Sequence, residues 1–170
     1  VEKIPLTFQS EEHYFRSFVY PLLEETRTEL ASTMKMMYRA PFAEISSLRK
    51  AKCREKMMYD VTVGGWRNSE SRKDPYRILP GDLLILANGE PGSVSDLQSS
   101  KWAFLLVNNT EDDDGTPVQF KVTASQEIEI HDGMFVVFLM NITTQKRIWN
   151  SLHKHANRDI IKEILYPDSM

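Results

Sequence analysis

Positively charged side chains close to an aromatic ring are the residues of this chain best suited to binding chemistry. The stretch R-K-A-K-C-R-E-K, residues 49–56, is the densest basic run, and more cations follow just after a tryptophan. Such cations can bind a phosphate backbone while a base stacks on the ring. The sequence predicts contacts with single-stranded RNA or DNA at Arg49, Lys50, Lys52, Arg54, Trp66, Arg67, Arg72, Lys73 and Arg77. The alternative is a solvated loop that binds nothing.

Motifs for nucleotide hydrolysis and for zinc are missing from the sequence. No Gly-Lys dipeptide occurs, so the chain has no G-x-x-x-x-G-K-[ST] loop to hold phosphates, and it has no G-x-G-x-x-G either. It also lacks C-x-x-C and H-E-x-x-H. We therefore expect no catalytic residues, no metal site and no cofactor in this chain, and we expect that it is not an enzyme.

The histidines, the cysteine and the acidic run of the sequence lack the neighbouring residues that a metal site or a catalytic site would require. His153 and His155 are two residues apart, which places them on different faces of a helix. Cys53 has cationic neighbours but no histidine close in sequence, so we expect an inert thiol. The acidic run 111–114 lacks the closing glutamate of a calcium loop, and we interpret it as a hairpin tip.

Composition and charge are typical of a folded intracellular domain. Apolar residues make up 41% and the net charge is -3, so nucleic acid would have to bind at a local patch. With one cysteine no intrachain disulfide is possible, which is consistent with a reducing compartment, nuclear or cytoplasmic. The longest uncharged apolar stretch, residues 134–140, is too short for a membrane span, and we see no signal peptide. The start at Val1 suggests a piece of a longer protein.

The periodicity of apolar residues predicts helices at both ends of the chain. Residues 10–38 should form a long stalk helix, because apolar residues recur in steps of three and four after a capping Ser10. Pro21 should kink or split this helix. Residues 143–166 should form further helices, which end before Pro167.

The middle of the chain reads as strands separated by turns. Alternating or continuous apolar runs predict strands at 59–63, 83–87, 102–107, 119–124, around 128–130 and 134–142, whereas residues 42–58 have no clear pattern. About six short strands without helices between them favour an antiparallel barrel or sandwich over a parallel sheet. The predicted class is α+β, with a barrel at 59–142.

Three segments, in order, resemble a helicase family. They are H-Y-F-R-S-F-V-Y-P-L-L-E-E-T-R (13–27), L-P-G-D-L-L-I-L (79–86) and N-I-T-T-Q-K-R-I-W-N-S-L-H (141–153), with I-I-K-E-I-L-Y-P-D-S (160–169) after them. These segments are similar to the stalk, a barrel strand and the following helices of senataxin-like superfamily 1 helicases. The likeness is greatest to the N-terminal region of plant members, often labelled UvrD-like.

The resemblance implies that residues 1–170 form a single accessory domain of an ATP-dependent helicase. ATP and magnesium would bind a motor that lies outside this chain. The domain would help to bind single-stranded RNA or DNA and couple it to the motor, with the motor itself as an intramolecular partner. The alternative is a protein–protein interaction or regulatory module that recruits or restrains the helicase without touching nucleic acid. The contact residues named above rest on charge and aromaticity, not on the resemblance.

Overall fold

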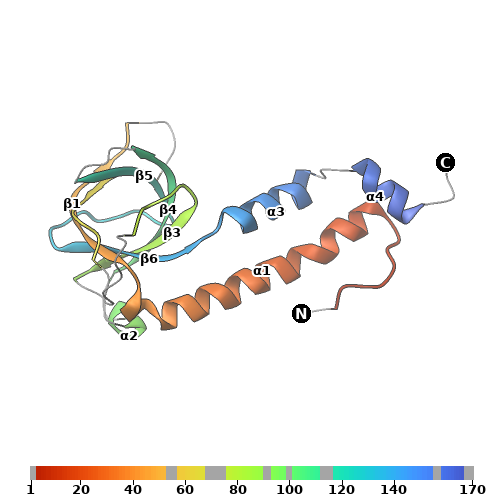
Figure 1. Ribbon diagram of the computed structural model, residues 1–170, viewed down its shortest axis with the longest axis horizontal. Helices are drawn as coiled ribbons and strands as arrows, with labels where there is room; N and C mark the ends of the chain where they lie inside the picture. Colours follow the sequence, from red (N-terminus) through yellow and green to blue (C-terminus); the bar gives the residue numbers. More distant parts are fainter. Residues whose placement is uncertain are drawn as a thin grey trace. The chain divides into compact units, whose positions relative to one another are not determined.

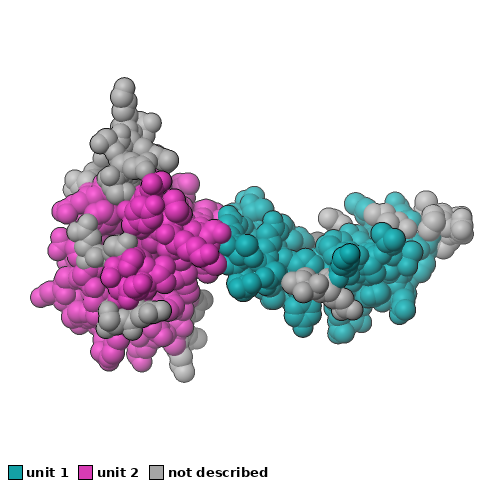
Figure 2. Space-filling view, turned by 90° about the horizontal axis from the view of Figure 1, so that it is seen from below, with its two compact units in different colours: residues 1–29, 143–170 teal, residues 30–142 magenta. Residues whose placement is uncertain are grey.

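The computed structural model describes residues 3–52, 57–67, 76–89, 93–98, 101–111, 117–154 and 158–166. The chain divides into two compact units (Figure 2). Residues 1–29 and 143–170 form one, which we call the helical unit. Residues 30–142 form the other, which we call the barrel unit.

The N-terminal helix α1 (Glu11–Lys35) begins where the sequence predicts. The hydroxyl of Ser10 accepts a hydrogen bond from the His13 N–H at 3.1 Å, which is the expected N-terminal cap. The helix continues through Pro21, so the expectation of a split there is wrong. Pro21 removes one hydrogen bond, but Phe15 and Leu22 are buried on either side of it and hold the helix together.

The C-terminal helices α3 (Thr143–Lys154) and α4 (Arg158–Leu165) pack along the first part of α1 (Figure 1). Gln145 donates a hydrogen bond to Glu29 at 3.0 Å, and Arg158 forms an ion pair with Glu11 at 3.6 Å. These two contacts lie at opposite ends of the paired segment. The C-terminal helices therefore run antiparallel to α1.

Six strands close into an antiparallel barrel in the order β1-β2-β5-β4-β3-β6, which confirms the predicted α+β class. The strands are β1 (Phe42–Lys50), β2 (Met58–Val63), β3 (Asp82–Asn88), β4 (Ala103–Glu111), β5 (Val118–Ala124) and β6 (Met134–Asn141). A short 3-10 helix, η1 (Met37–Arg39), precedes β1, and α2 (Val94–Gln98) lies between β3 and β4.

Two of the strand assignments need correction. The barrel starts at Phe42 and not at residue 59, because β1 pairs with both β2 and β6. Residues 128–130 form no strand. Their backbone is held by a side chain instead, since the Ile128 N–H donates to the Tyr59 hydroxyl at 3.1 Å.

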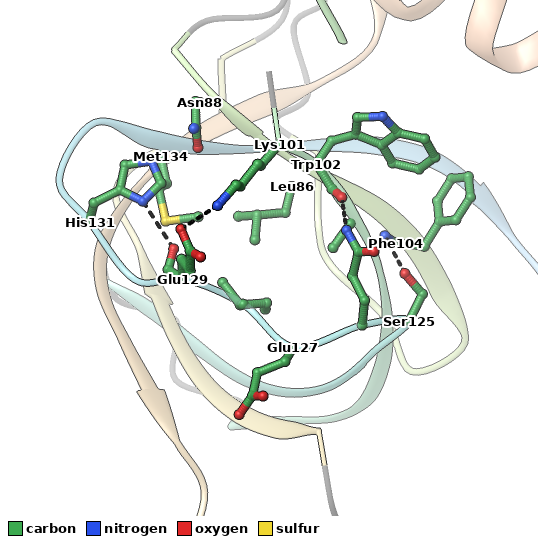
Figure 3. A pocket seen from close by; sticks show the side chains of 13 residues that line it. Leu86, Asn88, Lys101, Trp102, Phe104, Ser125, Glu127, Glu129, His131 and Met134 are labelled. Atoms are coloured by element: carbon green, nitrogen blue, oxygen red, sulfur yellow. Dashed lines mark hydrogen bonds and ion pairs between the residues drawn. The ribbon is translucent and has the colours of Figure 1, made fainter. Parts of the chain in front are cut away.

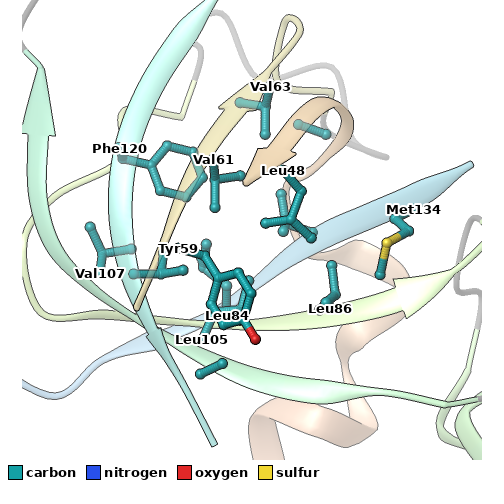
Figure 4. Close-up of a cluster of buried hydrophobic side chains, with 14 of the residues drawn as sticks. Leu48, Tyr59, Val61, Val63, Leu84, Leu86, Leu105, Val107, Phe120 and Met134 are labelled. Atoms are coloured by element: carbon teal, nitrogen blue, oxygen red, sulfur yellow. The ribbon is translucent and has the colours of Figure 1, made fainter. Parts of the chain in front are cut away.

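Apolar side chains fill the barrel and also cover one side of it. The interior cluster includes Val61, Leu84, Leu105 and Phe120, each at most 2% exposed (Figure 4). A second cluster lies outside the barrel wall, where the end of α1, η1 and α2 pack on β3 and β6. Strands β3 and β6 are thus buried on both faces, which explains their continuous apolar sequences.

Candidate nucleic-acid interface

The outer face of β1, β2 and β5 carries a polar surface that the strand register builds from three distant segments. Arg49 pairs with Asp60, and Asp60 pairs with Lys121. Ser47 and Gln119 flank Thr62 one row further along. Because side chains alternate along a strand, these residues face outward while Tyr59, Val61, Phe120 and Val122 fill the core.

These outward side chains line a depression of about 410 Å³, which we call the outer groove. Its charged residues are Arg49, Asp60 and Lys121, two cations with one anion between them. Neither Arg49 nor Lys121 forms an ion pair with any residue in the described ranges. The groove therefore offers two cations, about 10 Å apart across three strands, to an anionic ligand.

The end of β1 extends this basic surface. Lys50 forms an ion pair with Glu127 at 3.1 Å, and the hydrogen bond to that carboxylate raises the pKa of Lys50. Lys52 follows as an exposed residue. Arg54, like Cys53, lies outside the described residues. Of the first predicted group, Arg49 and Lys52 are thus exposed cations with no acidic partner among the residues that the structure describes.

The second predicted group lies at the other end of the β1–β2 hairpin. Arg67 exchanges two backbone hydrogen bonds with Phe42, at 2.9 and 2.8 Å, and so sits beside the start of β1. Arg49 is near the end of the same strand, about 20 Å away at roughly 3.3 Å per residue. The two groups of cations therefore do not form one continuous patch.

Trp66 belongs to the wall of the barrel more than to its surface. It is half-buried, packs against the interior cluster and makes an edge-to-face contact with Tyr76, with ring centroids 4.5 Å apart. Its indole N–H is buried and has no hydrogen-bond partner among the described residues. Of the other predicted contacts, Arg77 is exposed, and Arg72 and Lys73 lie outside the described residues.

Sequence reasoning missed Lys121 as a partner of Arg49. The alternation within 119–124 already predicts that Gln119, Lys121 and Thr123 share one face. This face lies near Arg49 only because β2 pairs with both β1 and β5. The pattern of residues within a single strand does not predict which strands pair.

A buried polar network ties β3 to the end of β6. The Asp82 carboxylate accepts hydrogen bonds from the Leu79 N–H at 2.8 Å, the Asn141 side chain at 2.7 Å and the Tyr76 hydroxyl. Burial, reinforced by the bond to Asp82, raises the pKa of Tyr76, so its hydroxyl stays a donor. Every donor around the carboxylate is satisfied, which indicates a structural role.

Neither metal-ligand clusters nor membrane-spanning helices are found in the parts of the chain that the structure describes. No three His, Cys, Asp or Glu side chains come together there as metal ligands would. No helix in those parts is long and apolar enough to cross a membrane. His153 stacks on Trp149 with ring centroids 3.9 Å apart, which accounts for this histidine without a ligand.

Comparison with known proteins gives one family. The family model described as Domain of unknown function (DUF6469) matches residues 1–170. Among curated proteins, none matches the chain.

Proposed function

The chain belongs to the DUF6469 family, described as a domain of unknown function, and we propose that it is a non-catalytic domain that binds single-stranded nucleic acid. The outer groove is the proposed contact surface, together with Lys52 at the end of the β1 strand. Phosphates would bind Arg49 and Lys121, while the polar side chains beside them position the strand.

One observation carries this proposal: Arg49 and Lys121 project from the same face of the barrel, on either side of Asp60, and have no ion-pair partner in the described ranges. Surface cations that only serve solubility are commonly interspersed with acids. Here a single acid, Asp60, faces two cations. A local excess of positive charge on a chain with a net charge of -3 is more easily explained by an anionic ligand than by overall composition.

The resemblance of residues 13–27, 79–86 and 141–153 to senataxin-like helicases supports a further element of the proposal. The domain would assist an ATP-dependent motor by binding the single nucleic-acid strand along which that motor moves. The sequence has no Gly-Lys dipeptide, so any ATP and magnesium would be bound by that motor and not by this chain.

The decisive experiment compares charge reversals in and outside the groove. Binding of labelled single-stranded RNA and DNA is followed by fluorescence anisotropy over a series of salt concentrations. Arg49→Glu with Lys121→Glu should lower affinity about tenfold, because both phosphate contacts become repulsive. The slope of log affinity against log salt should fall by about 1.4, since each phosphate contact contributes about 0.7 for single strands.

A matched control reverses two exposed cations of α3, Lys146→Glu with Lys154→Glu. This variant changes the net charge by the same amount but leaves the groove intact. Its affinity should stay within about twofold of the wild-type value. Equal losses in both variants would point to unspecific attraction, and a wild-type chain that binds neither RNA nor DNA would disprove the proposal.

A protein–protein interaction module remains the second candidate, and one observation favours it. The helical unit exposes Ile148, Trp149 and Ile160, which are between 37% and 56% accessible. Large apolar side chains at such exposure are common at interaction surfaces. This candidate predicts that Ile148→Glu with Ile160→Glu abolishes association with the motor region while nucleic-acid affinity is unchanged.

A further inference from the structure

The open end of the barrel holds a cavity of about 610 Å³, and the function of the outer groove does not account for it. We call it the mouth cavity. It lies between the end of β3, the starts of β4 and β6, and the irregular segment 125–131 (Figure 3). Its volume falls within the roughly 300–1,000 Å³ of sites that bind small organic ligands.

The floor of the mouth cavity is the apolar core of the barrel itself. Leu86, Ala103 and Met134 belong to the interior cluster, and Ile128 packs against it. Trp102 and Phe104 pack instead in the outer cluster and lie at the edge of the cavity (Figure 3). A ligand group that enters the mouth would therefore rest on four aliphatic side chains.

The wall of the cavity is fixed in place by hydrogen bonds to its backbone. The Tyr59 hydroxyl accepts from the Ile128 N–H at 3.1 Å, the Ser125 hydroxyl accepts from the Phe104 N–H at 3.1 Å, and the Gln126 amide donates to the Trp102 carbonyl. Segment 125–131 has no strand pairing to position it. These side-chain bonds, together with the backbone bond from the Ser125 N–H to the Phe104 carbonyl at 2.9 Å, hold the wall in place.

The charges at the rim cancel within the protein. Lys101 bridges to Glu129 at 2.6 Å, and Glu127 binds Lys50 at 3.1 Å. Two further side chains with hydrogen-bonding capacity line the rim. They are the Asn88 amide and the His131 imidazole, whose Nδ1 lies 2.9 Å from the Glu129 carbonyl oxygen. An apolar floor with a polar rim, whose lysine and glutamate side chains pair with each other, suits a flat, uncharged ring that has donors and acceptors along one edge.

The mouth cavity also borders the basic end of β1. Glu127 lines the cavity and pairs with Lys50, which is next to Arg49 of the outer groove. A strand whose phosphates lie along Arg49 and Lys52 would thus pass the mouth. We propose that the mouth cavity accepts one unstacked base of the bound single strand, with its edge toward Asn88 and His131. This inference rests on the proposed function and identifies its ligand class more closely.

The test separates contacts with bases from contacts with phosphates. Two single-stranded oligonucleotides of equal length and charge are compared, one of thymidines and one with abasic sites throughout, on the whole 170-residue chain. The wild-type chain should bind the thymidine strand about tenfold more tightly. Asn88→Ala with His131→Ala should reduce this ratio to about twofold and leave the abasic affinity unchanged, because both residues are exposed and unfolding is not expected.

Two further variants complete the design. Ile128 is a half-buried residue of the cavity floor, and Ile128→Trp, which fills the cavity, should reduce the ratio in the same way. Asn150→Ala with His153→Ala removes the same two residue types from exposed positions of α3 and should leave it unchanged.

If both cavity variants keep the tenfold ratio, the mouth cavity is not the base site. The proposal for the outer groove still stands in that case if Arg49→Glu with Lys121→Glu weakens the binding of both oligonucleotides. If the wild-type chain binds neither strand, the proposed function fails, and this inference fails with it.

Discussion

Asp82 is the one charged side chain that is buried among the residues that the structure describes, with 2% of its surface exposed. Its three hydrogen-bond donors come from the preceding turn and from the end of β6. Asp82→Ala would leave these donors without an acceptor, and each buried unsatisfied group costs about 1–3 kcal/mol. We expect the free energy of unfolding to fall by about 3 kcal/mol, measured by urea denaturation with tryptophan fluorescence.

Two companion variants show whether the network causes this loss. Tyr76→Phe removes one donor and keeps the ring, so it should cost about 1 kcal/mol. Asp60→Ala removes a carboxylate from an exposed strand position and should change stability by no more than about 0.5 kcal/mol. Similar losses in Asp82→Ala and Asp60→Ala would show that burial and hydrogen bonding at Asp82 contribute little.

At the scale of the element, α1 depends on its cap at Ser10. Ser10→Ala removes the acceptor for the His13 N–H, and such caps contribute about 1 kcal/mol. Hydrogen exchange at the His13 amide should become about fivefold faster. Ser32→Ala is the control, because Ser32 is exposed in the last turn of α1, far from the cap, and alanine is the better helix former. Faster exchange at His13 in both variants would rule out the cap as the cause.

Sequence patterns predict a helix or strand correctly where the spacing of apolar residues within that segment matches its structure. Strands β3 and β6 are continuous apolar runs because both of their faces are covered, and α1 has the helical period. Strand β1 lacks a clear pattern because its register shifts between Ile45 and Ser47, which interrupts the alternation of side chains. Ile128 and Ile130 look like a strand, but a tyrosine from another strand holds that segment.

The candidate site shows the same limit at the scale of the molecule. Arg49 and Trp66 are close in sequence, yet the antiparallel β1–β2 pair places their neighbourhoods at opposite ends of a hairpin. Arg49 and Lys121 are far apart in sequence, and the barrel brings them to one face. The sequence therefore identifies basic side chains that could bind an anion. The order of the six strands in the closed barrel determines which of these side chains lie on the same face.

The same strand order predicts that the barrel unit folds alone. Both apolar clusters consist of residues within 30–142, and the Ile142 N–H closes the barrel by donating to the Gly81 carbonyl at 2.9 Å. A fragment of residues 30–142 should thus give a β-type circular dichroism spectrum and one cooperative urea transition, followed through Trp66 and Trp102. Leu105→Ala in the fragment should cost about 2–5 kcal/mol, because Leu105 is fully buried. A fragment that unfolds without cooperativity would mean that the barrel requires the helical unit for its stability.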